Sequence, residues 1–242
     1  MKLAASGERF RVIDDFLPEG DLEEIRALAR RRPFHEVASV VNAEADGLAH
    51  RSRGALLRQD AVLLSEDTEV VGMPNAYHAV LQELHSRRDM FGVAGEDWTV
   101  VGFSFWRYPA GSRLGWHNDV DARGEFVFFL HEEWNASWAG DLTLLDADPA
   151  TVEIDTTGMS PLEAVEAKAG AASHALTSIV PKPNRLVLIK EGTIHCIQRV
   201  DRTAGENVRQ TMTGFVGINP PEKQQQADNS NLERLVSVLD LG

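Results

Sequence analysis

The amino-acid sequence predicts a mostly β protein with flanking helices, built as a sandwich or a jelly roll. Five short runs rich in β-branched and aromatic residues follow Trp98, and Gly and Pro separate them, which is typical of strands in such folds. These runs cover residues 100–107, 126–130, 141–145, 185–190 and 211–218. The residues before Trp98 instead show apolar side chains at helical spacing.

Two helices are predicted in the first third of the chain. The first covers residues 21–32, where Asp21 suits the N-cap, apolar side chains form one stripe, and Pro33 ends the pattern. We expect it to pack on the outside of the sheet. The second covers residues 76–88 on the same criterion. Residues 35–60 are polar and irregular, and they predict a loop over the mouth of the molecule.

Length and composition favour one domain over residues 1–220. A chain of 242 residues with 43% apolar residues can bury one core of ordinary size, and β barrels of this length are often one domain. We expect a helical N-terminal part at 1–97 and a jelly-roll core at 98–220. The long interval 146–183, with a short helix within 156–168, is either a substrate lid or a surface excursion. Residues 221–242 form a polar C-terminal tail.

Several classes of protein fit the composition poorly. The single cysteine, Cys196, rules out an internal disulfide framework and is compatible with a reducing compartment. No apolar run approaches the roughly 18 residues of a membrane span, and the N-terminus does not resemble a signal peptide. We therefore expect a cytoplasmic protein without a membrane partner. The net charge of −13 argues against a nucleic acid partner, because such binding depends on Lys and Arg.

Three residues have the chemistry and spacing of a metal site. His117 and Asp119 lie two positions apart, so a strand would present both on one face. His195, which follows the apolar run 185–190, supplies a second imidazole. Two nitrogens and one carboxylate oxygen on one face of an octahedron are typical of non-haem Fe(II) oxygenases. The remaining positions stay open for a co-substrate and dioxygen.

The residues around these ligands resemble a known family, the 2-oxoglutarate and Fe(II) dependent oxygenases of the prolyl 4-hydroxylase-like type. The similar segments follow the family's order along most of the chain: 10–18, 106–119, 128–134, 139–142, 184–189, 195–200 and 209–215. The resemblance implies a double-stranded β-helix core, a jelly roll of the cupin-like kind. It also implies that His117, Asp119 and His195 bind Fe(II).

The resemblance further implies a binding site for 2-oxoglutarate. Arg209 matches the basic residue that pairs with the distal carboxylate of this co-substrate, and its planar fork suits that group. Thr211, on the same face of the strand, would donate a hydrogen bond, and Tyr108 would line the same pocket. The spacing of 14 residues from His195 is longer than in many members, so Arg199 and Arg202 remain alternatives to Arg209.

The implied activity is hydroxylation of an unactivated carbon, with succinate and CO2 as co-products. Asp119 favours this outcome over halogenation, because halogenating relatives replace the carboxylate with a small residue. The substrate would be an amino acid, a peptidyl group or another small natural product, and the oligomeric state stays open. His131 is interpreted as a surface or packing residue, and Trp116 as a core or rim aromatic.

Two other functions remain in view. A nucleic-acid dealkylase shares the iron triad, but the acidic charge disfavours it, and the strand after Arg209 lacks the further arginine of the dealkylase pattern. A non-catalytic jelly-roll binding module belongs to a different class, and the presence of all three ligands together with Arg209 argues against it.

Overall fold

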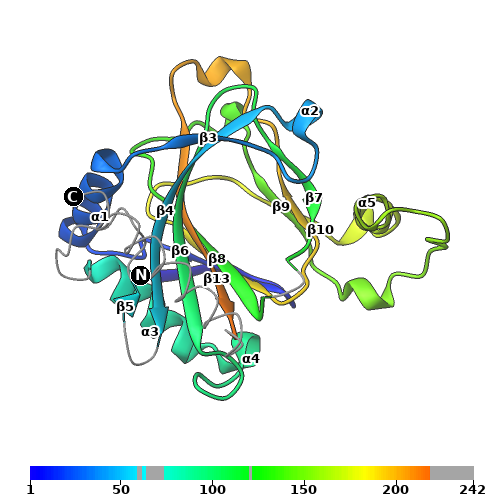
Figure 1. Cartoon of the computed structure of the whole chain (residues 1–242), viewed down its shortest axis with the longest axis horizontal. Coiled ribbons are helices and arrows are strands. Elements are labelled where there is room, and N and C mark those ends of the chain that lie inside the picture. The colour runs from blue at the N-terminus through cyan, green and yellow to red at the C-terminus, as the bar shows by residue number, and fades with distance from the viewer. Residues whose placement is uncertain (59–61, 64–73, 120–121, 219–242) are drawn as a thin grey trace, which may run out of the picture.

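Two antiparallel β-sheets face each other in the computed structural model, which describes residues 1–58, 62–63, 74–119 and 122–218. The larger sheet has the order β1 (Lys2–Ser6), β2 (Phe10–Asp14), β11 (Leu186–Lys190), β8 (Gly124–Phe129), β13 (Arg209–Gly217), β6 (Val100–Tyr108), β4 (Leu48–Arg58) and β3 (His35–Ala38), with β5 (Val62–Leu63) paired to β4. The smaller has the order β10 (Leu176–Ile179), β9 (Leu142–Leu145), β12 (His195–Ile197) and β7 (Leu114–His117). The predicted jelly-roll fold class is confirmed (Figure 1).

Helices cover the outer face of the larger sheet. α1 (Glu19–Arg31) and α3 (Asn75–Ser86) bury their apolar stripes against side chains such as Phe105 and Phe128, and α4 (Arg88–Phe91) follows directly (Figure 1). Both predicted helices are confirmed. α1 begins earlier than expected, because Pro18 and not Asp21 occupies its N-cap. Among the described residues, no helix combines the length and apolar character needed to cross a bilayer.

The two sheets bury a second core between them. Phe126 and Phe128 of β8 point to the helices, whereas Val127 and Phe129 pack against Leu144 and its neighbours on the smaller sheet. The side chains of a strand alternate between its two faces, so every second residue of β8 faces the space between the sheets. Glu125 shares this inner face, which places one carboxylate at the edge of an apolar core.

The loop predicted for residues 35–60 is wrong, and so is the purely helical character predicted for 1–97. The segment forms β3, the short helix α2 (Ala43–Asp46) and β4, and β4 pairs with β6 along much of its length. Arg51 and Arg53 on the inner face alternate with the buried Ser52 on the outer face. The alternation is therefore polar on both faces, which hides a strand from a search for apolar periodicity.

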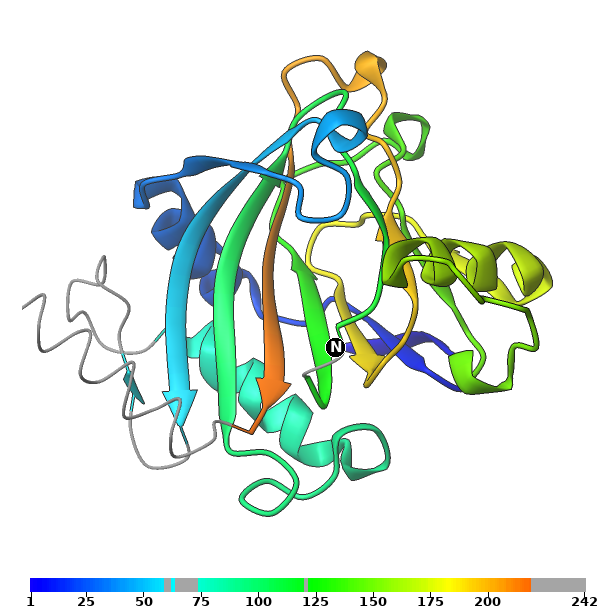
Figure 2. The same ribbon diagram turned by 45° about the vertical axis from the view of Figure 1, so that its right-hand side comes forward.

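The interval 146–183 is only in part the predicted insertion. It contains η2 (Pro149–Thr151), α5 (Pro161–Ala171) and η3 (Ser173–Ala175), but it also contains β10, a strand of the smaller sheet. The α5 helix packs Val165 and Ala169 against Trp116, which places it outside β7 and away from the larger sheet (Figure 2). This position does not support the lid interpretation. The predicted tail at 221–242 lies outside the described residues.

Candidate metal and co-substrate site

Two histidines meet where β7 and β12 pair. His117 ends β7 and His195 begins β12, and the two residues are direct partners in the strand register with ring centroids 4.1 Å apart. In each case Nδ1 lies close to the carbonyl oxygen two residues earlier, at 2.8 Å for Gly115 and 3.0 Å for Thr193. A carbonyl only accepts, so Nδ1 carries the proton and Nε2 keeps its lone pair. Both Nε2 atoms face the same space.

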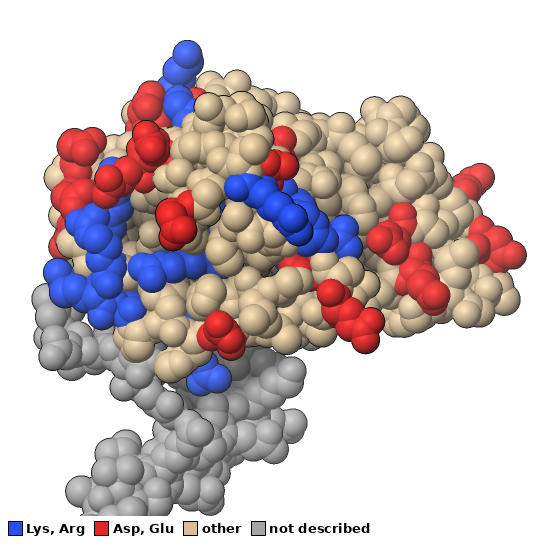
Figure 3. Space-filling model, turned by 90° about the horizontal axis from the view of Figure 1, so that it is seen from above, with Lys and Arg blue, Asp and Glu red and all other residues tan. Residues whose placement is uncertain are grey.

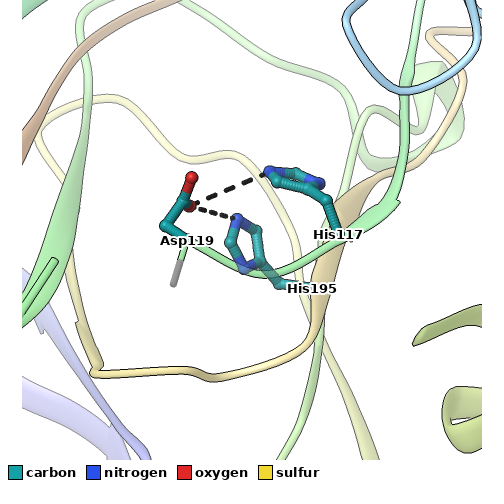
Figure 4. A group of neighbouring side chains, drawn as sticks. All are labelled: His117, Asp119 and His195. Carbon is teal, nitrogen blue, oxygen red and sulfur yellow. Dashed lines mark ion pairs between the residues drawn. The ribbon is translucent and has the colours of Figure 1, made fainter. Parts of the chain in front are cut away.

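Asp119 completes the predicted group. Its Oδ2 atom lies 4.0 Å from Nε2 of His117 and 3.7 Å from Nε2 of His195 (Figure 4). One ligand atom from each residue can be chosen so that all lie within 4.8 Å of one another. The Oδ2 atom is buried and accepts no hydrogen bond. The expectation that Asp119 lies on the strand with His117 is wrong, because β7 ends at His117.

Both imidazoles are neutral near pH 7. Burial lowers the pKa of His117 to about 4, the nearby charge of His195 lowers it further, and Asp119 opposes both effects. Burial also lowers the pKa of His195. The contacts with Asp119 are therefore not ion pairs at neutral pH. Two neutral imidazole nitrogens beside one carboxylate oxygen form the donor set that a divalent iron ion prefers.

A fourth group at this position escaped the sequence analysis. The Oε1 atom of Glu125 lies 3.2 Å from Nε2 of His195. Burial raises the pKa of Glu125 well above its usual range, and the negative charge of Asp119 and a hydrogen bond with it raise it further. Since Nδ1 of His195 already carries the proton of that ring, Glu125 supplies the proton of this contact. The only signal in the sequence was one acidic residue at the start of an apolar strand.

The strand that carries His117 is held in place by a buried carboxylate. Asp46, fully buried at the end of α2, accepts hydrogen bonds from Nε of Arg113 at 2.9 Å, the backbone N of Gly115 at 3.1 Å and the hydroxyl of Ser39 at 2.6 Å. The carbonyl of the same Gly115 orients His117. Asp46 thus fixes the backbone that positions the first imidazole.

Arg209 lies at the start of β13 and is completely buried. Its Nε donates to the carbonyl of Gly140 at 2.7 Å, while Nη1 and Nη2 have no hydrogen-bond partner. The guanidinium lies 4.9 Å from the ring of Phe129 and 5.7 Å from that of Tyr108. Burial lowers its pKa to about 10, so it stays charged at neutral pH. A buried cation with two unused donors is incomplete without an anion.

The neighbours of Arg209 extend this incomplete site. Thr211, on the same face of β13, is fully buried, and its hydroxyl has no partner. Tyr108 is the register partner of Arg209 on β6, and burial raises its pKa to about 12. His131 is buried, and burial and the charge of Arg209 lower its pKa to about 3. The packing interpretation of His131 is confirmed, and its neutral ring adds no second charge beside Arg209.

The alternatives to Arg209 lie elsewhere. Arg199 is exposed and donates to the carbonyls of Gly111 and Ala45. Arg202 is exposed at the start of η4 (Arg202–Ala204). Neither is buried with free donors. Gly140 supports the choice of Arg209, because it has a φ of +73° and an added Cβ would lie 3.2 Å from Cδ of Arg209.

Comparison with known proteins identifies the family of this site. Residues 103–217, which contain all six predicted site residues, match the family model described as the 2OG-Fe(II) oxygenase superfamily. This part of the chain belongs to that superfamily. The oxygenase is therefore an enzyme whose cofactors are Fe(II) and 2-oxoglutarate, as the family description states. The residues present fit both cofactors, since they offer three converging metal donors and a buried arginine without a counter-ion.

Solved structures show the same fold at low sequence identity. A prolyl-4-hydroxylase from Pseudomonas putida has a TM-score of 0.58 and 16% identity, over 87% of this chain and 93% of the other. HygX from Streptomyces hygroscopicus, with nickel, 2-oxoglutarate and hygromycin B bound, has a TM-score of 0.57 and 12% identity, over 88% and 84%. A prolyl hydroxylase from Trichoplax adhaerens, in complex with a hypoxia inducible factor peptide fragment, has a TM-score of 0.52 and 14% identity, over 87% and 84%. No curated protein sequence matches the oxygenase.

Proposed function

We propose that the protein is an Fe(II)- and 2-oxoglutarate-dependent hydroxylase whose single domain covers residues 1–220. His117, Asp119 and His195 bind Fe(II). Arg209 and Thr211 bind the distal carboxylate of 2-oxoglutarate, in a pocket lined by Tyr108. Bound Fe(II) supplies the oxidising chemistry with dioxygen, and succinate and CO2 are the co-products.

The observation that carries this proposal is the state of Arg209. A fully buried guanidinium with two unpaired donors is costly, because neither water nor a counter-ion stabilises its charge. A carboxylate presents two oxygens at the spacing of the two Nη atoms, and the hydroxyl of Thr211 supplies a third donor on the same face. One end of a dicarboxylate satisfies all three groups, and its other end remains available to the metal.

The residues of the chain divide the remaining tasks. The two neutral imidazoles offer lone pairs that the carbonyls of Gly115 and Thr193 orient. Asp119 adds the negative charge that offsets part of the charge of Fe(II). It also occupies a position that a halide would need, which favours hydroxylation. The inward-facing Phe129 and Val127 form an apolar wall that limits access of water.

The proposed substrate is an amino acid, a peptidyl group or another small natural product. Two of the similar structures contain a peptide fragment or hygromycin B, so this fold accommodates both kinds of molecule in those proteins. The acidic net charge of −13 favours such substrates over nucleic acids.

The test is an anaerobic titration of the metal-free protein with Fe(II) and then with 2-oxoglutarate. We expect the weak visible charge-transfer band of the chelated complex. Asp119→Ala should abolish it, whereas Asp89→Ala, an exposed carboxylate paired with Arg11, should leave it unchanged. A folded wild-type protein that gives no band overturns the proposal.

A further inference from the structure

A second arginine faces the space between the sheets, and the proposed chemistry does not use it. Arg51 lies on β4 opposite Trp106 of β6, and its guanidinium is 5.2 Å from the centre of the indole ring. Its Nη2 atom donates to the hydroxyl of Ser104 at 3.1 Å. Stacking on Trp106 holds the guanidinium in a fixed plane, so its remaining donors have a defined direction.

Arg51 has no counter-ion among the described residues. No carboxylate forms an ion pair with it, and its Nε atom is buried without a hydrogen-bond partner. Arg53 lies two positions along the same face of β4 and is exposed, and it too pairs with no described carboxylate. Burial and the charge of Arg53 lower the pKa of Arg51. Two adjacent cations without a partner are unusual in a chain with a net charge of −13.

The strand register connects Arg51 to the co-substrate pocket. Arg51 pairs with Trp106, Trp106 pairs with Thr211, and Thr211 pairs with Phe129, so these side chains form one row on the inner face of the larger sheet. Neighbouring strands lie about 4.8 Å apart, which separates Arg51 from Thr211 by roughly 10 Å along the sheet. The row therefore runs from the buried pocket to a half-buried cation.

The two arginines differ in access. Arg209 is completely buried at the inner end, whereas Arg51 is half-buried on β4, close to the edge of the sheet that β3 forms. Viewed from above, over β3 and α2, basic side chains gather on this side of the molecule although acidic residues are in excess (Figure 3). An anionic molecule that enters between the sheets therefore meets positive charge before it reaches the metal site.

We propose that the substrate carries a carboxylate or a phosphate group that pairs with Arg51. This inference rests on the proposed function and adds the substrate class. The free Nε and one Nη of the stacked guanidinium bind two oxygens of the anion side by side, and Arg53 adds a second positive charge. The anion fixes the position of the substrate, while its target carbon lies toward the metal. Arg51 is thus a specificity-determining residue, separate from the co-substrate site at Arg209.

The experiment measures succinate release by the Fe(II)-loaded protein with matched pairs of compounds. Free amino acids are compared with the corresponding amino acid amides for the carboxylate, and phosphoethanolamine is compared with ethanolamine for the phosphate. The variants are Arg51→Met, which keeps the apolar stem on Trp106, and Arg51→Lys, which keeps the charge but loses the fork. Arg30→Met is the control, because Arg30 is an exposed arginine on α1 that pairs with Glu23 and Glu132.

We expect the anionic member of at least one pair to stimulate succinate release more than its neutral partner. Arg51→Met should raise the KM for that anionic compound by about 10- to 100-fold and leave the KM for 2-oxoglutarate unchanged. Arg51→Lys should give an intermediate value, and Arg30→Met no change. A purely structural role of Arg51 would instead lower the Tm without this split between the two KM values.

Two results would overturn the inference. One is a protein that forms the Fe(II)·2-oxoglutarate band but distinguishes no anionic compound from its neutral partner, and this result leaves the proposed oxygenase function intact. The other is an unchanged KM for the anionic compound in Arg51→Met. Absence of the band itself points to failure of the proposed function, so the two failures are distinguishable.

Discussion

The carboxyl group of Glu125 contacts the ring nitrogen of His195 that the metal requires, with Oε1 at 3.2 Å from Nε2. In the metal-free protein this contact satisfies both buried groups. Once the metal takes Nε2, Glu125 loses that partner and keeps Asp119 as its hydrogen-bond partner. Glu125 is therefore a positioning residue for the carboxylate ligand.

Substitution of Glu125 tests this role. Glu125→Gln keeps a donor for Asp119, and we expect Fe(II) affinity close to that of the wild type. Glu125→Leu removes the donor, and we expect Fe(II) affinity about 10- to 100-fold lower, the usual effect of losing a group that orients a metal ligand. The measurement is an anaerobic Fe(II) titration followed by the 2-oxoglutarate charge-transfer band. Equally weak binding in both variants would show that the charge of Glu125 matters more than its hydrogen bond.

Arg209 is expected to control the co-substrate and not the metal. Arg209→Lys replaces a planar fork with a single ammonium group, which should raise the concentration of 2-oxoglutarate needed for half-saturation by about 10- to 100-fold. Fe(II) binding should stay unchanged. Arg199→Ala is the matched control, because Arg199 is exposed and bonds only to backbone carbonyls. If Arg199→Ala changed the 2-oxoglutarate requirement and Arg209→Lys did not, the assignment would move to Arg199.

Asp46 should affect both stability and iron binding. Asp46→Asn replaces one acceptor oxygen with a donor that faces Arg113, Ser39 and the backbone N of Gly115. We expect a loss of about 1 to 3 kcal/mol in the free energy of unfolding. Because Gly115 also orients His117, Fe(II) affinity should fall by roughly tenfold. Asp89→Asn, at an exposed position, is the control for unfolding and titration.

Asp14 predicts a pH dependence of stability far from the metal site. Hydrogen bonds from Arg185 and Lys182 lower the pKa of Asp14 from 3.8 to about 2. A group whose pKa is lower in the folded state stabilises the fold above its unfolded pKa, and this contribution is lost as the pH falls through the folded pKa. Asp14→Asn should therefore cost about 2 kcal/mol at pH 7.

The difference between Asp14→Asn and the wild type should shrink as the pH falls from about 4 toward 2. Urea unfolding at several pH values measures it. Asp15→Asn is a close control, since Asp15 is exposed and Asn tolerates its φ of 51°. A constant difference across this pH range would mean that Asp14 acts through packing and not through its charge.

The strands that carry the core were predictable because burial made them apolar. β8, β11 and β13 lie between two other strands, so most of their residues are apolar and their approximate limits follow from the sequence. β4 was missed because the inner face on which Arg51 lies is polar, and polar residues give no apolar periodicity. The sequence pattern thus failed where a strand faces the proposed substrate space.

The site was predictable to the extent that its chemistry requires particular residue types. His117, Asp119 and His195 stood out by type and spacing, and they do converge. Glu125 and His131 did not stand out, because a single acidic residue or histidine in a strand most often serves solubility or packing. Only the folded chain shows that one contacts His195 and the other lies beside Arg209.

The three proposed ligands come from two mechanically different parts of the fold. His117 and His195 are register partners in adjacent strands, so backbone hydrogen bonds set the distance between their rings. Asp119 lies beyond the end of β7, where no strand pairing restrains it. The imidazole pair thus acts as a fixed base and the carboxylate as an exchangeable part. Changes in the segment after His117 can alter the third ligand, and with it the outcome of oxidation, while the barrel stays as it is.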